Sequence, residues 1–144
     1  MSRRNLWAWV AAAGILAGAG VRFADLSRHC LWYDELASLR RASTLSFGEH
    51  LREMRGNHPL YEVAVLRPWS RVTQSDGGIR IPSAVFGTAT LLAMWVLASK
   101  LDRRVAAAAV RMLALSPLHV MFSRIARPYA LATLLAALAS WALV

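Results

Sequence analysis

Long apolar runs constrain this chain more than any other feature. The runs at 6–21 and 81–99 carry no charged residue, and the run at 105–122 carries only Arg111. A fourth apolar run starts at Tyr129. A helix needs about 20 apolar residues to cross the hydrocarbon core of a bilayer. We therefore expect an all-α, polytopic bundle of about four membrane helices, at residues 5–22, 81–99, 105–122 and 129–144.

The composition of the chain indicates which kinds of molecule it can bind. The 144 residues are 57% hydrophobic with a formal charge of +9, and no basic stripe lies on a soluble module. We therefore expect membrane lipid or phosphate as a partner, and no nucleic acid. The single Cys30 excludes an intrachain disulfide and any cysteine-based metal cluster. No residue pattern indicates a cofactor or a metal ligand, although a requirement for a divalent metal ion stays open.

Basic residues beside the apolar runs predict an orientation. Arg3 and Arg4 precede the first run, and Lys100 with Arg103 and Arg104 separates the second from the third. Short basic loops stay cytoplasmic. We expect an integral protein of the cell (inner) membrane, with a cytoplasmic N-terminus and a large extracytoplasmic loop at 23–80. The first run also has the pattern of a cleavable signal peptide, but three further runs favour an uncleaved helix.

Two short helices are expected in the loop. Ser46 and Glu49 form a capping-box pattern before apolar residues at helical spacing, with His50 on a polar face. The segment "LYEVAVLRPW" is interrupted by charges and predicts a second interfacial helix. If it instead entered the membrane, every later segment would be inverted. The segment "QSDGG" predicts a flexible turn before the second membrane helix.

On this topology, four polar features share the external side. They are Asp34-Glu35, Asn57-His58-Pro59, Arg80, and Ser123-Arg124 with Arg127-Pro128-Tyr129. A carboxylate near the membrane surface can act as a general base, and arginines suit a phosphate-bearing leaving group. Simpler interpretations stay open: the acidic pair as an ordinary helix start, His58 as a turn residue, and the arginines as interfacial anchors.

Four blocks in order support the functional interpretation: "WYDELAS", "NHPLY", "IRIPSAVFGTATLLAMWVLASKL" and "LALSPLHVMFSRIARPYAL". From about Leu31 onward the chain resembles the N-terminal part of GT-C class membrane glycosyltransferases, family 39, which are protein O-mannosyltransferase-like and aminoarabinose-transferase-like. The resemblance implies inverting transfer of a sugar from a polyprenyl-phosphate donor to an extracytoplasmic acceptor. It implies Asp34 as the catalytic base and Glu35 as its partner in organising the site. His58, Arg80, Arg124 and Arg127 would lie near the donor phosphate or shape the cavity.

Two departures from the pattern of this family matter. Related sequences commonly have two prolines after the histidine where this chain has only Pro59, and many have an acid where this chain has Ile125. Because the last apolar run has no polar flank, we expect an N-terminal portion of a longer enzyme that is inactive alone. The alternatives are a non-catalytic small helical membrane protein or degenerate remnant and, last, a transporter segment.

Overall fold

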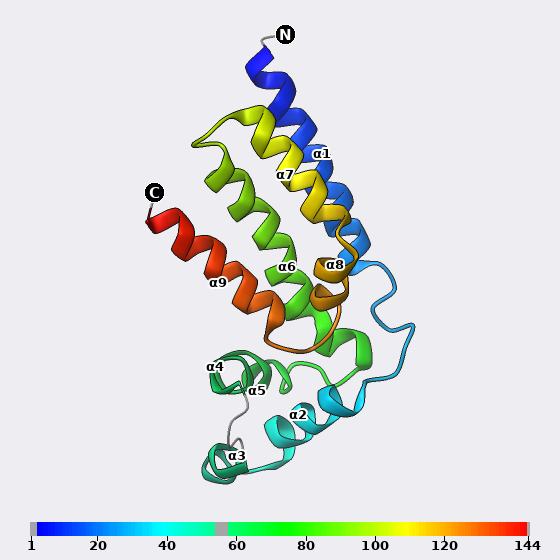
Figure 1. The fold of residues 1–144 in the computed structure, drawn as a ribbon. Coiled ribbons are helices and arrows are strands. Elements are labelled where there is room, and N and C mark those ends of the chain that lie inside the picture. Colours follow the sequence, from blue (N-terminus) through cyan, green and yellow to red (C-terminus); the bar gives the residue numbers. More distant parts are fainter. Residues whose placement is uncertain (1–2, 54–57, 144) are drawn as a thin grey trace.

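The computed structural model describes residues 3–53 and 58–143, and all regular structure in these ranges is helical (Figure 1). Asn57, which belongs to one of the predicted external polar features, lies outside the described residues. Four helices form a bundle, in which α6 contacts the other three: α1 (Arg3–Phe23), α6 (Asp76–Ala98), α7 (Arg103–Leu115) and α9 (Tyr129–Ala142). The expected all-α helical bundle is therefore confirmed.

Short helices gather at one end of the bundle. Figure 1 shows them at the end opposite to the N-terminus and to the turn between α6 and α7. The basic segment at the N-terminus and the basic segment between α6 and α7 therefore lie at the same end of the bundle. The predicted topology requires this, because it places both on the cytoplasmic side. The short helices are α2 (Tyr33–Thr44), α3 (Phe47–Glu53), α4 (Pro59–Tyr61), the π-helical turn η1 (Glu62–Leu66) and α5 (Arg67–Trp69).

The expected membrane helices differ in length and continuity. Within the described residues, only α1 from Asn5 and α6 are single helices long and apolar enough to cross a bilayer. The third expected helix, 105–122, is broken into α7 and α8 (Pro117–Ser123), which meet at 64°. Only the two helices taken together are long and apolar enough to cross a bilayer as one span. Proline at 117 lacks an amide hydrogen and cannot continue α7. The apolar helix α9 has only 14 residues in the described range.

Arg22 compensates the break between α7 and α8. Its side chain is fully buried at the end of α1, and it donates to the carbonyls of Leu113 and Ala114, at 3.2 and 3.3 Å. The end of a helix leaves carbonyl groups without intrahelical partners, and such groups are costly in an apolar setting. A cation from a neighbouring helix therefore stabilises the bend.

The start of α6 corrects the expected turn at "QSDGG". Ser75 caps the helix by accepting a hydrogen bond from the Gly78 amide at 3.2 Å, so Asp76, Gly77 and Gly78 form the first helical turn. A Cβ atom at Gly77 would collide with the Ser27 hydroxyl. Glycine is needed there because the loop after α1 crosses the helix start at close range.

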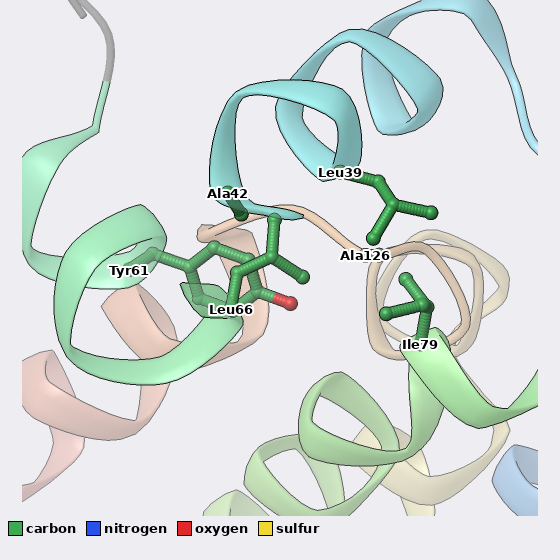
Figure 2. Close-up of a cluster of buried hydrophobic side chains, with 6 residues drawn as sticks. All are labelled: Leu39, Ala42, Tyr61, Leu66, Ile79 and Ala126. Atoms are coloured by element: carbon green, nitrogen blue, oxygen red, sulfur yellow. The ribbon is translucent and has the colours of Figure 1, made fainter. Parts of the chain in front are cut away.

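An apolar core joins the short helices to the bundle. Figure 2 shows its six side chains, which come from α2, α4, η1, α6 and the segment before α9: Leu39, Ala42, Tyr61, Leu66, Ile79 and Ala126. Each is at most 7% exposed. Burial of this kind contributes roughly 25 cal/mol per Å² of apolar surface. The first loop is therefore a packed layer that fixes α2 against the membrane helices.

The helix α3 was expected from the sequence and is present, but one of its residues, His50, faces the interior and not a polar surface. The Ser46 amide donates to Glu49 at 2.9 Å and the Glu49 amide donates to the Ser46 hydroxyl at 3.4 Å, so the predicted capping box is present at α3. The structure buries His50 completely, although the sequence pattern placed it on a polar face. Its ring nitrogens lie 3.2 Å from Arg67 Nη1 and 3.3 Å from Glu62 Oε2. Both polar atoms of the ring therefore have partners, as buried polar groups require.

Candidate active site

Asp34 and Glu35 begin the same helix but have opposite surroundings. Both lie in the first turn of α2, where carboxylates are favoured by the helix dipole. Asp34 is exposed, whereas Glu35 is 1% exposed. Neighbouring helical positions differ by about 100° around the axis, so the first faces outward and the second faces the bundle. The pair expected to act together is divided between two environments.

The carboxylate of Glu35 is fully engaged. Arg80 donates to both of its oxygens, from Nε at 3.0 Å and from Nη2 at 2.7 Å. The amides of Ala126 and Trp32 donate to it at 2.6 and 3.0 Å. Four hydrogen bonds use the acceptor capacity of a carboxylate. Glu35 therefore ties α2 to α6 and to the segment before α9.

Arg80 is engaged just as completely. Beyond Glu35 it donates to the backbone carbonyls of the loop after α1, at 2.8–3.0 Å: Leu26, His29 and Cys30. An arginine has five N–H donors, and all five have partners here. The sequence-predicted Arg80 thus lies directly behind Glu35, as part of a buried bidentate ion pair.

A pocket of about 200 Å³ opens beside the acidic pair. Its wall combines α2 with the segment between α8 and α9, so residues far apart in sequence meet here. Asp34 and Arg127 are the two charged residues with exposed or half-buried side chains in this wall. The lining residues are Trp32, Asp34, Glu35, Met121, Phe122, Ile125, Arg127 and Tyr129.

Arg127 differs from Arg80 in having spare donors. Within residues 3–53 and 58–143, its side chain makes one hydrogen bond, from Nη1 to the Ser38 hydroxyl at 3.1 Å, and no ion pair. Its Nε atom is buried and has no partner there. A cation without a carboxylate partner suits an anionic ligand.

His58 and Arg124 do not line this pocket, but each lines a different pocket nearby. The His58 ring packs edge-on against Tyr129, with centroids 6.3 Å apart, and lines an apolar groove against α9 of about 250 Å³. Arg124 donates to the Ala24 carbonyl at 2.8 Å and so caps the end of α1. It lines a neighbouring pocket of about 480 Å³ with Arg28 and Arg80, and Trp32 is part of both pockets.

A second buried carboxylate was missed by the sequence interpretation. Glu62 is 2% exposed and accepts from Arg41 at 2.7 and 3.1 Å, from Ser38 at 2.8 Å, and lies 3.3 Å from His50 Nε2. The available signal was a glutamate inside the apolar segment "LYEVAVLRPW". A charge in such a segment predicts a buried, paired group as well as an interfacial helix.

These contacts set the protonation of the loop carboxylates. Burial raises the pKa of Glu35, but the hydrogen bonds from Arg80, Ala126 and Trp32 outweigh it, and the pKa is lowered overall. Burial likewise raises the pKa of Glu62, and the bonds from Arg41 and Ser38 lower it below its ordinary value. Burial raises the pKa of Tyr61 to about 12. Both glutamates are therefore anions at neutral pH, and Tyr61 is a neutral donor.

Metal-ligand side chains do not cluster in the described ranges. No three His, Cys, Asp or Glu residues lie together there in a way that could hold an ion. Asp34 and Glu35 are neighbours, but the bonds to Arg80, Ala126 and Trp32 leave Glu35 no oxygen lone pair to share with Asp34 as a ligand.

Comparison with known proteins identifies the family. The family model described as dolichyl-phosphate-mannose-protein mannosyltransferase matches residues 57–144, which is more than half of the chain. No curated protein and no solved structure matched. His58, Arg80, Arg124 and Arg127 lie inside the matched region, whereas Asp34 and Glu35 precede it. The chain is thus a membrane protein that belongs to the dolichyl-phosphate-mannose-protein mannosyltransferase family.

Proposed function

We propose that this chain provides the acidic centre of a glycosyltransferase site, in which a sugar moves from a polyprenyl-phosphate donor to an extracytoplasmic acceptor. The observation that carries the proposal is the pocket shared by Asp34 and Arg127. Within the described residues, neither the Asp34 carboxylate nor the Arg127 guanidinium has an ion-pair partner, and both line this pocket. The description of the family names a lipid-phosphate sugar and a mannosyltransferase. A carboxylate can serve such a transfer as a general base, and a cation can bind the phosphate of the donor.

Asp34 is the general base in this proposal. It accepts a proton from the acceptor hydroxyl while that oxygen forms a bond to the anomeric carbon. The bond from the anomeric carbon to the phosphate oxygen breaks, and the electron pair leaves with the polyprenyl phosphate. Attack opposite to the leaving group inverts the anomeric centre. Because Glu35 has no free lone pair for a proton, Asp34 is the better base of the two.

The basic residues then divide into two groups. Arg127 lies in the pocket with unused donors, and we place the donor phosphate beside it. Arg124 lines the adjoining pocket. His58, whose ring packs against Tyr129, borders the apolar groove beside α9, which suits the lipid chain. Arg80 has no donor left for a phosphate, so we assign it with Glu35 to positioning of α2.

The wall of the pocket also supports a non-catalytic alternative. Ile125 lines the pocket at the position where related sequences commonly carry an acid. If that acid is required for acceptor binding or catalysis, the chain is a small helical membrane protein without transfer activity. Under this alternative, Asp34→Asn has no effect beyond the membrane stability of the chain.

Transfer of a labelled sugar from a polyprenyl phosphate tests the proposal. Membranes would contain the chain alone, and any longer gene product that includes it, in wild-type and Asp34→Asn forms. A base contributes about 10²–10⁴-fold, so we expect a loss in that range for Asp34→Asn. Asp102→Asn is the matched control: Asp102 caps α7 by accepting from the Arg104 amide at 2.6 Å, and asparagine caps equally well. Near-wild-type transfer by correctly inserted Asp34→Asn would refute the assignment.

Labelling of introduced cysteines tests the orientation. After replacement of Cys30, a cysteine at position 46 should react with an impermeant reagent from the extracytoplasmic side. A cysteine at position 102 should react only from the cytoplasmic side. The reverse result would separate the Asp34 pocket from an extracytoplasmic acceptor.

A further inference from the structure

Arg127 is held at two points, by its side chain and by its backbone. The guanidinium donates from Nη1 to the Ser38 hydroxyl at 3.1 Å. The Arg127 carbonyl accepts from the Ser83 hydroxyl at 3.4 Å. The two serines come from different helices, α2 and α6. Both serines are in turn bonded to consecutive residues of one short segment, Tyr61 and Glu62.

The side-chain link has a defined direction. The Ser38 hydroxyl lies 2.8 Å from Glu62 Oε1 and can only donate to it, because a carboxylate has no hydrogen to give. A hydroxyl has one hydrogen and two lone pairs. With its hydrogen on Glu62, Ser38 accepts from Arg41 Nη2 at 3.2 Å and from Arg127 Nη1. The charge of Glu62 therefore decides that Ser38 presents a lone pair to Arg127.

The backbone link follows the same logic. Ser83 uses its one hydrogen on the Arg127 carbonyl, so the Tyr61 hydroxyl is the donor in the 3.0 Å contact between the two. A raised Tyr61 pKa of about 12 keeps that phenol protonated. Tyr61 thus fixes the rotation of the Ser83 hydroxyl, and Ser83 fixes the peptide of Arg127.

Burial strengthens the hydrogen bonds that connect Arg127 to Glu62 through Ser38 and to Tyr61 through Ser83. Ser38, Ser83, Tyr61 and Glu62 are each at most 2% exposed, so water does not compete for these bonds. Tyr61 ends α4 and Glu62 begins the π-helical turn η1. Their side chains reach opposite neighbours, α6 and α2. Turns of this kind are rare and are frequently found at functional sites.

We propose that Tyr61 and Glu62 are positioning residues that hold Arg127 in the Asp34 pocket, acting through Ser83 and Ser38. The inference rests on the proposed function for the role of Arg127 toward the donor phosphate. It adds two residues that do not line the Asp34 pocket, although Tyr61 lines the neighbouring groove beside α9. Arg41 neutralises Glu62, so Arg127 has no carboxylate partner among residues 3–53 and 58–143 and can meet an anionic group.

A double-mutant cycle on ligand affinity tests the link through Ser38. The probe is farnesyl phosphate, a short polyprenyl phosphate, titrated against the protein in detergent micelles. A hydrogen bond to a charged group is worth about 10–100-fold in affinity, so we expect about that loss for Arg127→Ala and roughly 10-fold for Ser38→Ala. The double variant should bind no more weakly than Arg127→Ala. Ser43→Ala, which alters an exposed serine of the same helix, should bind as the wild type.

Two further variants distinguish a role in positioning Arg127 from a general loss of folded structure. Glu62→Gln and Tyr61→Phe should raise the KM for the donor and leave kcat for the bound donor within about 3-fold of the wild type. Independent, multiplying losses for Ser38→Ala and Arg127→Ala would overturn the proposal. So would equal losses in kcat and in kcat/KM for Tyr61→Phe in a protein that folds normally.

A readout without ligand distinguishes failure of this proposal from failure of the proposed function. The Nε–Hε resonance of Arg127, assigned by its absence in Arg127→Lys, reports how the guanidinium is held. Ser38→Ala and Glu62→Gln should shift or broaden this resonance, and Ser43→Ala should not. If the wild type does not bind farnesyl phosphate but the resonance responds in this way, positioning stands and the proposed donor fails. An unchanged resonance in Ser38→Ala contradicts the positioning role.

Discussion

The two buried carboxylates of the loop layer make a useful comparison. Glu35 and Glu62 are both almost fully buried, and each is paired with one arginine at 2.7 Å. Arg80, the partner of Glu35, is 5% exposed at its side chain and belongs to a membrane helix, whereas Arg41, the partner of Glu62, is 14% exposed and belongs to α2. The first pair joins the loop layer to the bundle. The second holds the loop layer together.

The comparison shows that a carboxylate can line a pocket and still have no free acceptor. Glu35 adjoins Asp34 in sequence and lines the same pocket, but its four bonds leave it no free acceptor. Glu62 is outside the pocket, but its hydrogen bond to Ser38 reaches Arg127, which is inside. A carboxylate outside the pocket is thus connected, through one serine, to a residue that lines it.

The largest effect should come from breaking the pair at the bundle. Arg80→Met leaves Glu35 as a buried charge without a counterion, which costs about 3–5 kcal/mol. We expect that decrease in the free energy of unfolding in detergent micelles, measured by denaturant titration. Arg40→Met, which alters an exposed arginine of α2, should change it by less than about 0.5 kcal/mol. A similarly small change for Arg80→Met would show that the pair does not anchor the layer.

A smaller loss is expected at the second pair. Glu62→Gln keeps the side-chain shape, and the more exposed Arg41 can turn toward water, so we expect about 1–3 kcal/mol. The same titration measures it. The matched control is Glu49→Gln, because glutamine also serves in a capping box. A cost for Glu62→Gln above that for Arg80→Met would reverse the comparison.

Acid should weaken both pairs. The pKa values of Glu35 and Glu62 are lowered in the folded protein, so the unfolded chain binds protons more readily at acidic pH. Their contribution is fully present above the ordinary glutamate pKa of about 4.3 and is lost as the pH falls through the folded values. Unfolding free energy should therefore decline from about pH 5 downward, less steeply in Glu62→Gln than in the wild type. An equal slope in the two proteins would exclude a contribution from Glu62.

The smallest effect concerns the single hydroxyl of Tyr61. Tyr61→Phe keeps the buried ring and removes one hydrogen bond to Ser83, so we expect a loss of about 1 kcal/mol. Tyr33→Phe, at an 85% exposed position, should have almost no effect on the same measurement. Equal values for the two would indicate that the Tyr61 hydroxyl carries no structural bond.

Sequence patterns predicted the helical fold, and the roles of the site residues stay a prediction. Apolar runs predicted the helices, and polar blocks that were predicted to lie together do meet: Glu35 accepts hydrogen bonds from Arg80 and from the Ala126 amide. The break at Ser116 was missed because a proline in an apolar run can start a helix as well as kink one. Glu62, Ser38 and Tyr61 were missed because their roles depend on which helices pack together.

The most direct test compares the neighbouring carboxylates in one experiment. Labelled-sugar transfer and unfolding free energy would be measured for Asp34→Asn and Glu35→Gln in the longest gene product that contains the chain. We predict that Asp34→Asn loses about 10²–10⁴-fold in transfer with wild-type stability, whereas Glu35→Gln loses stability by about 3–5 kcal/mol. Wild-type transfer by stable Asp34→Asn, or unchanged stability in Glu35→Gln, would contradict the division of roles between these two residues.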